Sequence, residues 1–219
     1  MDKRHLFSLS LALGCGLRGF GGLHAEPAGP ADYFPLAIGN RWIYESSEGT
    51  EAAPALEAWE VIRQEETNFV LRIKQPYVTS ESVEELVAAS ADGVSSLSRE
   101  AGDHKTQDTA SQFFLKSPLT PGATWKNGGG RYAITAIDET VTVPAGTFTN
   151  CVEVTRWSTA GTATVISLYA PGIGMVQREE RFQIIGGIGG FDAPQQGRTV
   201  LRLKTWTVQG PKSQVQSPE

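Results

Sequence analysis

Cysteine and histidine are scarce in this chain of 219 residues, which contains two cysteines and three histidines. A zinc site of the usual kind needs three or four such ligands, so the composition nearly excludes one. Without the first 25 residues Cys151 is the only cysteine left, and no internal disulfide can form. Cys151 lies mid-strand in the expected structure and has no basic neighbour in the sequence, which predicts a small buried side chain and not a reactive thiol.

The motifs of common hydrolases are also missing. A Ser-His-Asp triad would need His104 as its base, because the other two histidines, His5 and His24, lie in the N-terminal leader. His104 stands in a polar stretch, Gly102-Asp103-His104-Lys105, and the sequence contains no G-x-S-x-G elbow. We therefore expect an exposed loop histidine. The composition identifies no catalytic residue, cofactor or metal ligand, and it favours a protein that is not an enzyme.

No apolar run is long enough to span a bilayer, but the N-terminus has the pattern of an export signal. A basic start is followed by a short apolar run, Leu6–Leu13. One interpretation is a signal peptide over residues 1–25, cleaved after Ala25. The alternative is a lipobox, Ala12-Leu13-Gly14-Cys15, with Cys15 acylated. We favour plain cleavage, and labelling with a fatty-acid probe separates the two. The predicted location is the periplasm, or the outer membrane if Cys15 is lipidated.

Basic residues are fewer than acidic ones, and processing increases the difference. The net charge of the whole chain is −5, and removal of Lys3, Arg4, Arg18 and Asp2 with the leader brings it to −7. An acidic surface repels nucleic acid and anionic membranes, so neither is an expected electrostatic partner. The expected partners are a lipid or an envelope protein, with membrane contact only through a Cys15 anchor.

The stretch from Val141 to Val154, V-T-V-P-A-G-T-F-T-N-C-V-E-V, predicts two strands joined by a tight turn. Pro144 sets φ near −65° at the first corner, and Gly146 can take the left-handed position that follows. β-Branched residues flank the turn on both sides, which favours a pleated, half-buried surface. The same pattern of strand and turn recurs along the chain.

Short apolar and alternating segments predict ten or eleven strands in all. Besides the strand that begins at Trp42, they are expected near residues 56–63, 68–75, 82–89, 93–99, 131–137, 139–143, 148–157, 162–169, 174–185 and 198–208. Residues 81–89 could equally form a short helix, and residues 100–111 are expected to form a polar surface loop. The fold class is therefore all-β: an antiparallel meander forming a half-barrel, a barrel or a sandwich. Two strands, within 164–170 and 198–208, are apolar on both faces and should lie between layers or line a cavity.

The frame P-L-x-x-G-x-x-W occurs twice, at Pro35–Trp42 and at Pro118–Trp125. This recurrence suggests a single domain over residues 26–209, built from two duplicated β halves at 33–110 and 113–209. Residues 210–219 are polar and contain two prolines, which predicts a disordered tail.

Three segments together resemble a group of uncharacterised exported bacterial proteins that are often described as lipoproteins. They are Pro35–Tyr44, Val143–Cys151 and the segment Tyr169-Ala170-Pro171-Gly172-Ile173-Gly174-Met175-Val176. The resemblance covers most of the chain after the leader and implies no catalytic residue. The order of strands is also similar, more distantly, to half-barrel lipoprotein carriers, whose curved sheet wraps an apolar groove; this likeness concerns layout and not motif.

Four tryptophans, Trp42, Trp125, Trp157 and Trp206, are candidates to line such a groove, although aromatic residues more often form the core. The leading hypothesis is a non-enzymatic envelope protein that binds a lipid or another hydrophobic ligand in a curved sheet. An alternative is a protein–protein interaction module of the envelope, which predicts a filled core and an exposed apolar strip. A third hypothesis is a carboxylate-based hydrolase, which predicts acidic residues with raised pKa values meeting in one cleft.

Overall fold

The computed structural model describes residues 28–47, 54–75, 82–102, 104–184 and 195–209. These residues form one short 3-10 helix and one sheet of twelve strands. The elements are η1 (Pro30–Tyr33), β1 (Arg41–Ser47), β2 (Ala55–Glu65), β3 (Asn68–Lys74), β4 (Val83–Ser90), β5 (Gly93–Ala101), β6 (His104–Lys116), β7 (Thr124–Asn127), β8 (Gly130–Val143), β9 (Gly146–Ser158), β10 (Ala163–Ala170), β11 (Gly174–Ile184) and β12 (Gln195–Thr207). No helix among them is both long and apolar enough to cross a membrane.

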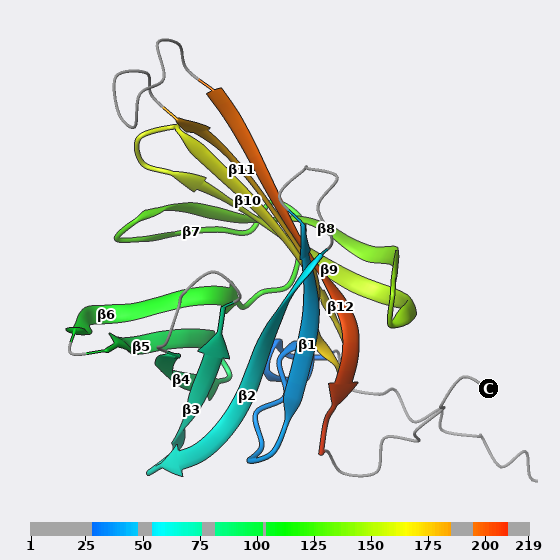
Figure 1. Ribbon diagram of the computed structural model, residues 1–219. Helices are drawn as coiled ribbons and strands as arrows, with labels where there is room; N and C mark the ends of the chain where they lie inside the picture. The colour runs from blue at the N-terminus through cyan, green and yellow to red at the C-terminus, as the bar shows by residue number, and fades with distance from the viewer. Residues whose placement is uncertain (1–27, 48–53, 76–81, 103, 185–194, 210–219) are drawn as a thin grey trace, which may run out of the picture.

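The sheet is an antiparallel meander, which confirms the predicted fold class. The strand order is β6-β5-β4-β3-β2-β1-β12-β11-β10-β9-β8-β7, so the first and last strands pair at its centre. The sheet curls until its edge strands, β6 and β7, lie on the same side of the molecule (Figure 1). It stays open there, because no ladder joins β6 to β7 in the part of the chain that the structure describes.

Hydrogen bonds that involve side chains bridge the open edges. The indole Nε1 of Trp125 donates to the carbonyl oxygen of Phe113 at 2.8 Å, and Asn127 Nδ2 donates to the same oxygen at 2.6 Å. The backbone N–H of Gly128 donates to Gln112 Oε1 at 3.1 Å. The curvature of the sheet is thus held by a few bonds at the seam as well as by the ladders.

The two P-L-x-x-G-x-x-W frames have the same local structure. Gly39 and Gly122 both have φ +89°, in the region that favours glycine. Gly39 N donates to Val61 O and Gly122 N donates to Ile134 O, and each of those partners donates back to the residue after the glycine. Each frame therefore leads into a strand that carries a buried tryptophan. The duplication itself stays a prediction.

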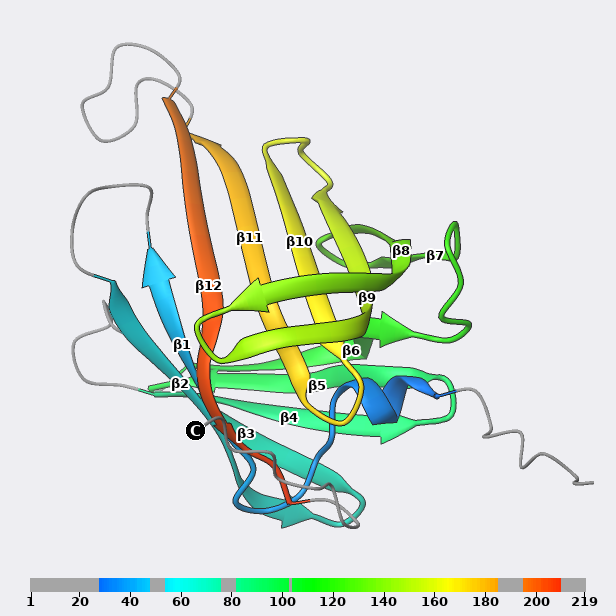
Figure 2. The ribbon, with the colours of Figure 1, turned by 90° about the vertical axis from the view of Figure 1, so that its right-hand side faces the viewer.

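The predicted hairpin at Val141–Val154 is confirmed, and it bends over the outside of the sheet. Val143 pairs with Gly146 across a two-residue turn, and Gly146 has φ +133°. Asp138 and Asn150 adopt positive φ where the ladder of β8 and β9 is irregular, and beyond them the hairpin crosses β10, β11 and β12 (Figure 2). Ala145 N donates to the carbonyl oxygen of Leu203 in β12 at 2.9 Å. Of the two strands expected to be apolar on both faces, β10 is buried on both at residues 167–170, whereas β12 keeps one face exposed at Arg202 and Lys204.

Two local predictions are wrong, and one open alternative is decided. Residues 100–111 are not a surface loop: they belong largely to β5 and β6, whose exposed polar ends pair with each other beyond the core. Residues 131–143 form one strand and not two, because β8 continues through the irregularity at Asp138. Of the two structures left open for residues 81–89, the strand is correct.

Candidate functional site

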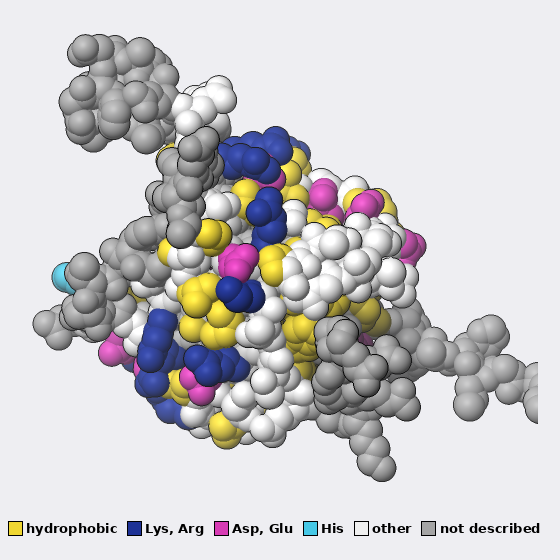
Figure 3. Space-filling model, turned by 45° about the vertical axis from the view of Figure 1, so that its right-hand side comes forward, with side chains coloured by type: hydrophobic (Ala, Val, Ile, Leu, Met, Phe, Trp, Pro, Cys, Tyr) yellow, Lys and Arg dark blue, Asp and Glu magenta, His cyan; other side chains and the backbone are white. Residues whose placement is uncertain are grey.

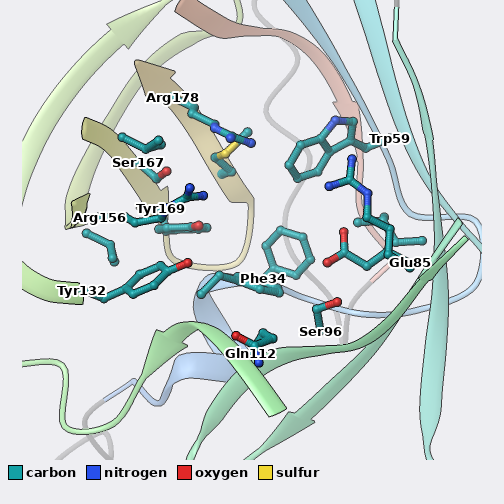
Figure 4. Close-up of a pocket in the computed structure, with 16 residues that line it drawn as sticks. Phe34, Trp59, Glu85, Ser96, Gln112, Tyr132, Arg156, Ser167, Tyr169 and Arg178 are labelled. Carbon is teal, nitrogen blue, oxygen red and sulfur yellow. The ribbon is translucent and has the colours of Figure 1, made fainter. Parts of the chain in front are cut away.

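The concave side of the sheet encloses a cavity of about 220 Å³. Its walls come from both halves of the sheet, as Figure 4 shows. Tyr132, Arg156 and Ser167 lie on one wall, and Trp59 and Glu85 lie on the opposite wall. Strands far apart in the sequence therefore meet across this space.

Phe34, which follows η1, closes one end of the cavity. It is almost fully buried, and η1 contacts β4, β5 and β11. The Phe34 ring stacks on Trp42 at 5.5 Å between centroids and meets Phe114 edge-on at 5.2 Å. The apolar part of the lining consists of Phe34, Trp59, Leu71, Phe114, Val154, Val165, Tyr169 and Met175. Burial raises the pKa of Tyr169 to about 12, so its hydroxyl is neutral at ordinary pH.

Contacts between the segments Pro35–Tyr44 and Tyr169–Val176 hold this end together. Trp42 Nε1 donates to the carbonyl oxygen of Ile173 at 2.6 Å, and Tyr44 Oη donates to that of Met175 at 3.0 Å. Gly174 has φ +111°, and a Cβ there would lie 3.0 Å from Trp42 Nε1. These motifs therefore fix the start of β11, whose Met175 lines the cavity.

Two irregularities in the ladders turn arginine side chains into the cavity. Tyr169 pairs with Met175, but Leu168 pairs with Gln177, which leaves one extra residue in β11. Met175 and Arg178 consequently share a face although they are three residues apart, and both line the cavity. Strict alternation would place them on opposite faces.

β5 contains an irregularity of the same kind. Val87 pairs with Ser96 and Leu86 pairs with Ser98, so one residue of β5 is extra. Ser96 and Arg99 therefore both line the cavity. Alternation along the sequence would place only one of them there, so these arginines were not among the predicted site residues.

Arg156 of β9 reaches the cavity without an irregularity, between Tyr132 and Val165 on the neighbouring strands. Its Nε atom is buried and has no hydrogen-bond partner among the residues that the structure describes. A buried N–H group almost always has a partner, either in the protein or in an ordered water. Arg156 therefore has an open hydrogen-bonding position inside the molecule.

The cavity is lined by three arginines, Arg99, Arg156 and Arg178, and by one carboxylate, Glu85. Neither Arg99 nor Arg156 forms an ion pair within the described ranges, and Arg178 lies 3.6 Å from Glu180. The remaining polar lining residues are Ser96, Gln112, Tyr132 and Ser167. The lining thus combines positive charge with an aromatic end.

A smaller cavity of about 120 Å³ lies against the other side of Arg178. Glu57 and Glu180 line it, and Glu57 is buried. Burial raises the pKa of Glu57, although the hydrogen bond from Trp59 Nε1, at 2.6 Å, opposes the shift. Two carboxylates therefore approach Arg178 from this side.

Adjacent carboxylates along the strands point to opposite faces, as the sequence predicts. Glu85 lines the cavity, whereas Glu84 bonds to Arg63 at 2.6 Å and to Arg72 at 2.9 Å outside it. Glu180 lies beside the smaller cavity, whereas the buried Glu179 bonds to two outer arginines. Acidic and basic side chains accordingly stand beside each other on the surface in Figure 3.

The carboxylate of Glu179 accepts hydrogen bonds from Arg198 at 2.8 Å and from Arg181 at 2.6 Å. These bonds, with that from Arg198 the largest contribution, lower the pKa of Glu179 to about 2. The outer arginines are thus paired at hydrogen-bond distance, whereas Arg156 inside is not.

The four tryptophans proposed for a groove lie elsewhere than in this cavity lining. Trp42 is fully buried in the core, and Trp125 bonds across the seam. Trp157 lies under the guanidinium of Arg131, with 4.4 Å from ring centroid to Cζ. Trp206 meets Phe148 edge-on at 5.4 Å. Contact of these four with a ligand stays a prediction, while the fifth tryptophan, Trp59, does line the cavity.

The remaining candidate residues lie either outside the described residues or away from the cavity lining. Cys15 and the cleavage site after Ala25 lie outside the described residues. Cys151 is fully buried, as predicted, and its pKa is raised to about 11 by burial and by Glu139. His104 is exposed at the start of β6 and not in a loop. Over the described ranges no group of histidine, cysteine and acidic residues could hold a metal ion.

No protein-family model matches this chain, and no curated protein matches its sequence. Two solved structures are similar at low level. One is a Bacteroides fragilis protein provisionally described as exported, with a YmcC-like fold; it is 14% identical, its TM-score is 0.35, and the match covers 80% of this chain and 98% of that one. The other, from Parabacteroides distasonis, is provisionally described as a lipoprotein; it is 14% identical, its TM-score is 0.36, and the coverage is 80% and 98%. Similarity of this degree supports no argument about function.

Proposed function

We propose that this chain is a non-enzymatic exported protein of the cell envelope that binds a hydrophobic or amphipathic ligand in the cavity of its curved sheet. The observation that carries the proposal is the cavity of about 220 Å³, closed at one end by Phe34 and lined by aromatic side chains from both halves of the sheet. Sites for small molecules are commonly concave, with an apolar lining and a few placed polar groups.

The size of the cavity limits what can enter it completely. An apolar cavity of about 150 Å³ can hold benzene, which has six carbons, so a cavity of about 220 Å³ has room for about eight carbons. A diacyl lipid would insert only part of one chain. Burial of each methylene contributes about 0.8 kcal/mol, enough for measurable affinity from one short chain.

The two alternatives fit these observations less well. An interaction module needs no interior space, and the described residues include only two large exposed hydrophobic side chains, Ile38 and Leu56. A carboxylate hydrolase needs two acidic groups in one cleft with room for a substrate; Glu57 and Glu180 meet in the smaller cavity of about 120 Å³ against Arg178, whereas Glu85 is the one carboxylate that lines the larger cavity. The export half of the proposal rests on the basic and apolar N-terminus, with Cys15 as the alternative anchor.

Calorimetric titration with octanoate and 1-octanol, both with eight carbons, tests the proposal. A variant that fills the cavity, Val165→Phe, should abolish binding. Ile166→Phe adds the same ring to the next residue of β10, which is not part of the cavity lining, and should bind as the unmodified protein does. Circular dichroism confirms folding of both variants. The proposal is wrong if neither probe binds the unmodified protein, or if both variants bind equally well.

A further inference from the structure

We infer that the ligand carries an anionic group, a carboxylate or a phosphate, which binds to the guanidinium of Arg156, on the cavity wall that also carries Arg178. This inference rests on the proposed function, because it specifies the chemistry of the ligand for the same cavity. The observation behind it is the juxtaposition of a buried Nε, without a partner among the described residues, and a partly closed cavity lined by three arginines.

The first step is that Arg156 lacks a partner where outer arginines have one. Arg63, Arg72, Arg181 and Arg198 each contact a glutamate at 2.6–2.9 Å. Arg156 has no such contact among the described residues, and its strand neighbours, Tyr132 and Val165, carry no negative charge. A buried N–H donor without an acceptor is costly, and an anion bound to the half-buried guanidinium would supply that acceptor.

The second step concerns the surrounding groups. Arg178 pairs with Ser167 of β10, and Arg156 pairs with Val165, two residues earlier in the same strand. Both arginine side chains therefore come from the same wall. Arg178 has only a long contact, 3.6 Å, with Glu180. The carboxylates facing these groups are Glu85 across the larger cavity and Glu57 and Glu180 in the smaller one. Within the larger cavity, guanidinium groups therefore outnumber carboxylates by three to one.

The third step is the chemistry of recognition. A guanidinium presents its N–H groups in a planar fork that matches two oxygens of a carboxylate or phosphate. Inside a partly closed cavity such a bond is stronger than in water. With the head group at Arg156, an attached chain would extend toward Phe34 and Phe114 at the apolar end. An amphipathic anion thus satisfies both parts of the lining at once.

The test is calorimetric titration of the full chain, after its leader is removed, with octanoate, octyl phosphate and 1-octanol, and with acetate and inorganic phosphate. Octanoate or octyl phosphate should bind at least about 10-fold more tightly than octanol, as expected for a hydrogen bond to a charged group. Preference between the two probes identifies the head group. Arg156→Met should reduce anion affinity about 10- to 100-fold and leave octanol affinity unchanged. Arg156→Lys, which retains the charge but not the fork, should have an intermediate affinity.

Arg131→Met is the matched control, because Arg131 is exposed on the adjacent strand and is not part of the cavity lining. It should leave every affinity unchanged. Equal binding of octanol and octanoate would overturn this inference and leave the proposed function intact. No binding of any alkyl probe would overturn the proposed function. Binding of phosphate or acetate alone, lost in Arg156→Met, would then keep the anion site and assign it to a small free anion. If Arg156→Met does not fold, Arg156→Lys and the comparison of probes decide the question.

Discussion

Removing the Arg156 guanidinium should stabilise the ligand-free protein. Its buried Nε has no acceptor among the described residues, and leaving such a donor unsatisfied costs about 1–3 kcal/mol. The rest of the side chain is half-buried, so water reduces this cost and we take the lower end, about 1 kcal/mol. Methionine has a similar length, no donor, and an apolar surface that suits neighbours such as Val165.

The assay is urea denaturation of the ligand-free protein, followed by circular dichroism. Arg156→Met should raise the free energy of unfolding by about 1 kcal/mol, or the melting temperature by about 2–4 °C for a chain of this size. Arg131→Met serves as the control, because its guanidinium lies over Trp157 at 4.4 Å and its loss should cost up to about 1 kcal/mol. The two substitutions remove the same charge but should change stability in opposite directions.

A decrease of more than about 1 kcal/mol in Arg156→Met would refute this reasoning. It would mean that the guanidinium is already paired in the free protein, for example with an ordered water, and is part of the structural core. A gain in stability together with a loss of anion binding is the pattern expected of a residue kept for function.

Three other predictions concern different parts of the structure. The pKa of Glu179 falls from 4.5 to about 2 on folding, so the ionised carboxylate stabilises the protein fully above about pH 4.5, and this stabilisation is lost as pH falls toward 2. In urea titrations Glu179→Gln should lower the free energy of unfolding by about 1–3 kcal/mol at pH 7 and by clearly less at pH 3. An equal loss at both pH values would contradict this prediction. Cys151, with a pKa of about 11 and no exposure, should react with a thiol reagent only after denaturation, so fast labelling of the native protein would show that its strand opens. Gly174→Ala should lower the free energy of unfolding by about 1–3 kcal/mol, because Gly174 has a positive φ and Trp42 lies close to it. Gly172→Ala should cost less, because φ is positive there too but the space around it is open. Equal losses in the two variants would show that the contact with the indole is unimportant.

Much of the fold could be predicted because its determinants are local. Alternating apolar residues mark the strands, and proline–glycine turns such as Val143-Pro144-Ala145-Gly146 mark where they reverse. The error at residues 100–111 has a physical cause, since polar strands at a sheet edge extend beyond the core and show no apolar alternation.

The cavity lining could be predicted less well, because it depends on the placement of single extra residues. Nothing in the sequence around Val176 or Leu97 marks an irregular ladder, yet these extra residues place Arg178 and the exposed Arg99 in the cavity lining. Arg156 follows normal alternation and could have been placed on the face of Val154, but its missing partner is a tertiary property. The tryptophans were the more conspicuous signal, but Trp42 belongs to the core and Trp125 to the seam.

The most direct test of the central claim is a crystal structure of the protein grown with octanoate. We predict an alkyl chain inside the curved sheet, extending toward Phe34, with its carboxylate within hydrogen-bond distance of Arg156 Nε. A cavity that contains only water, or octanoate bound solely on the outer face, would contradict the account.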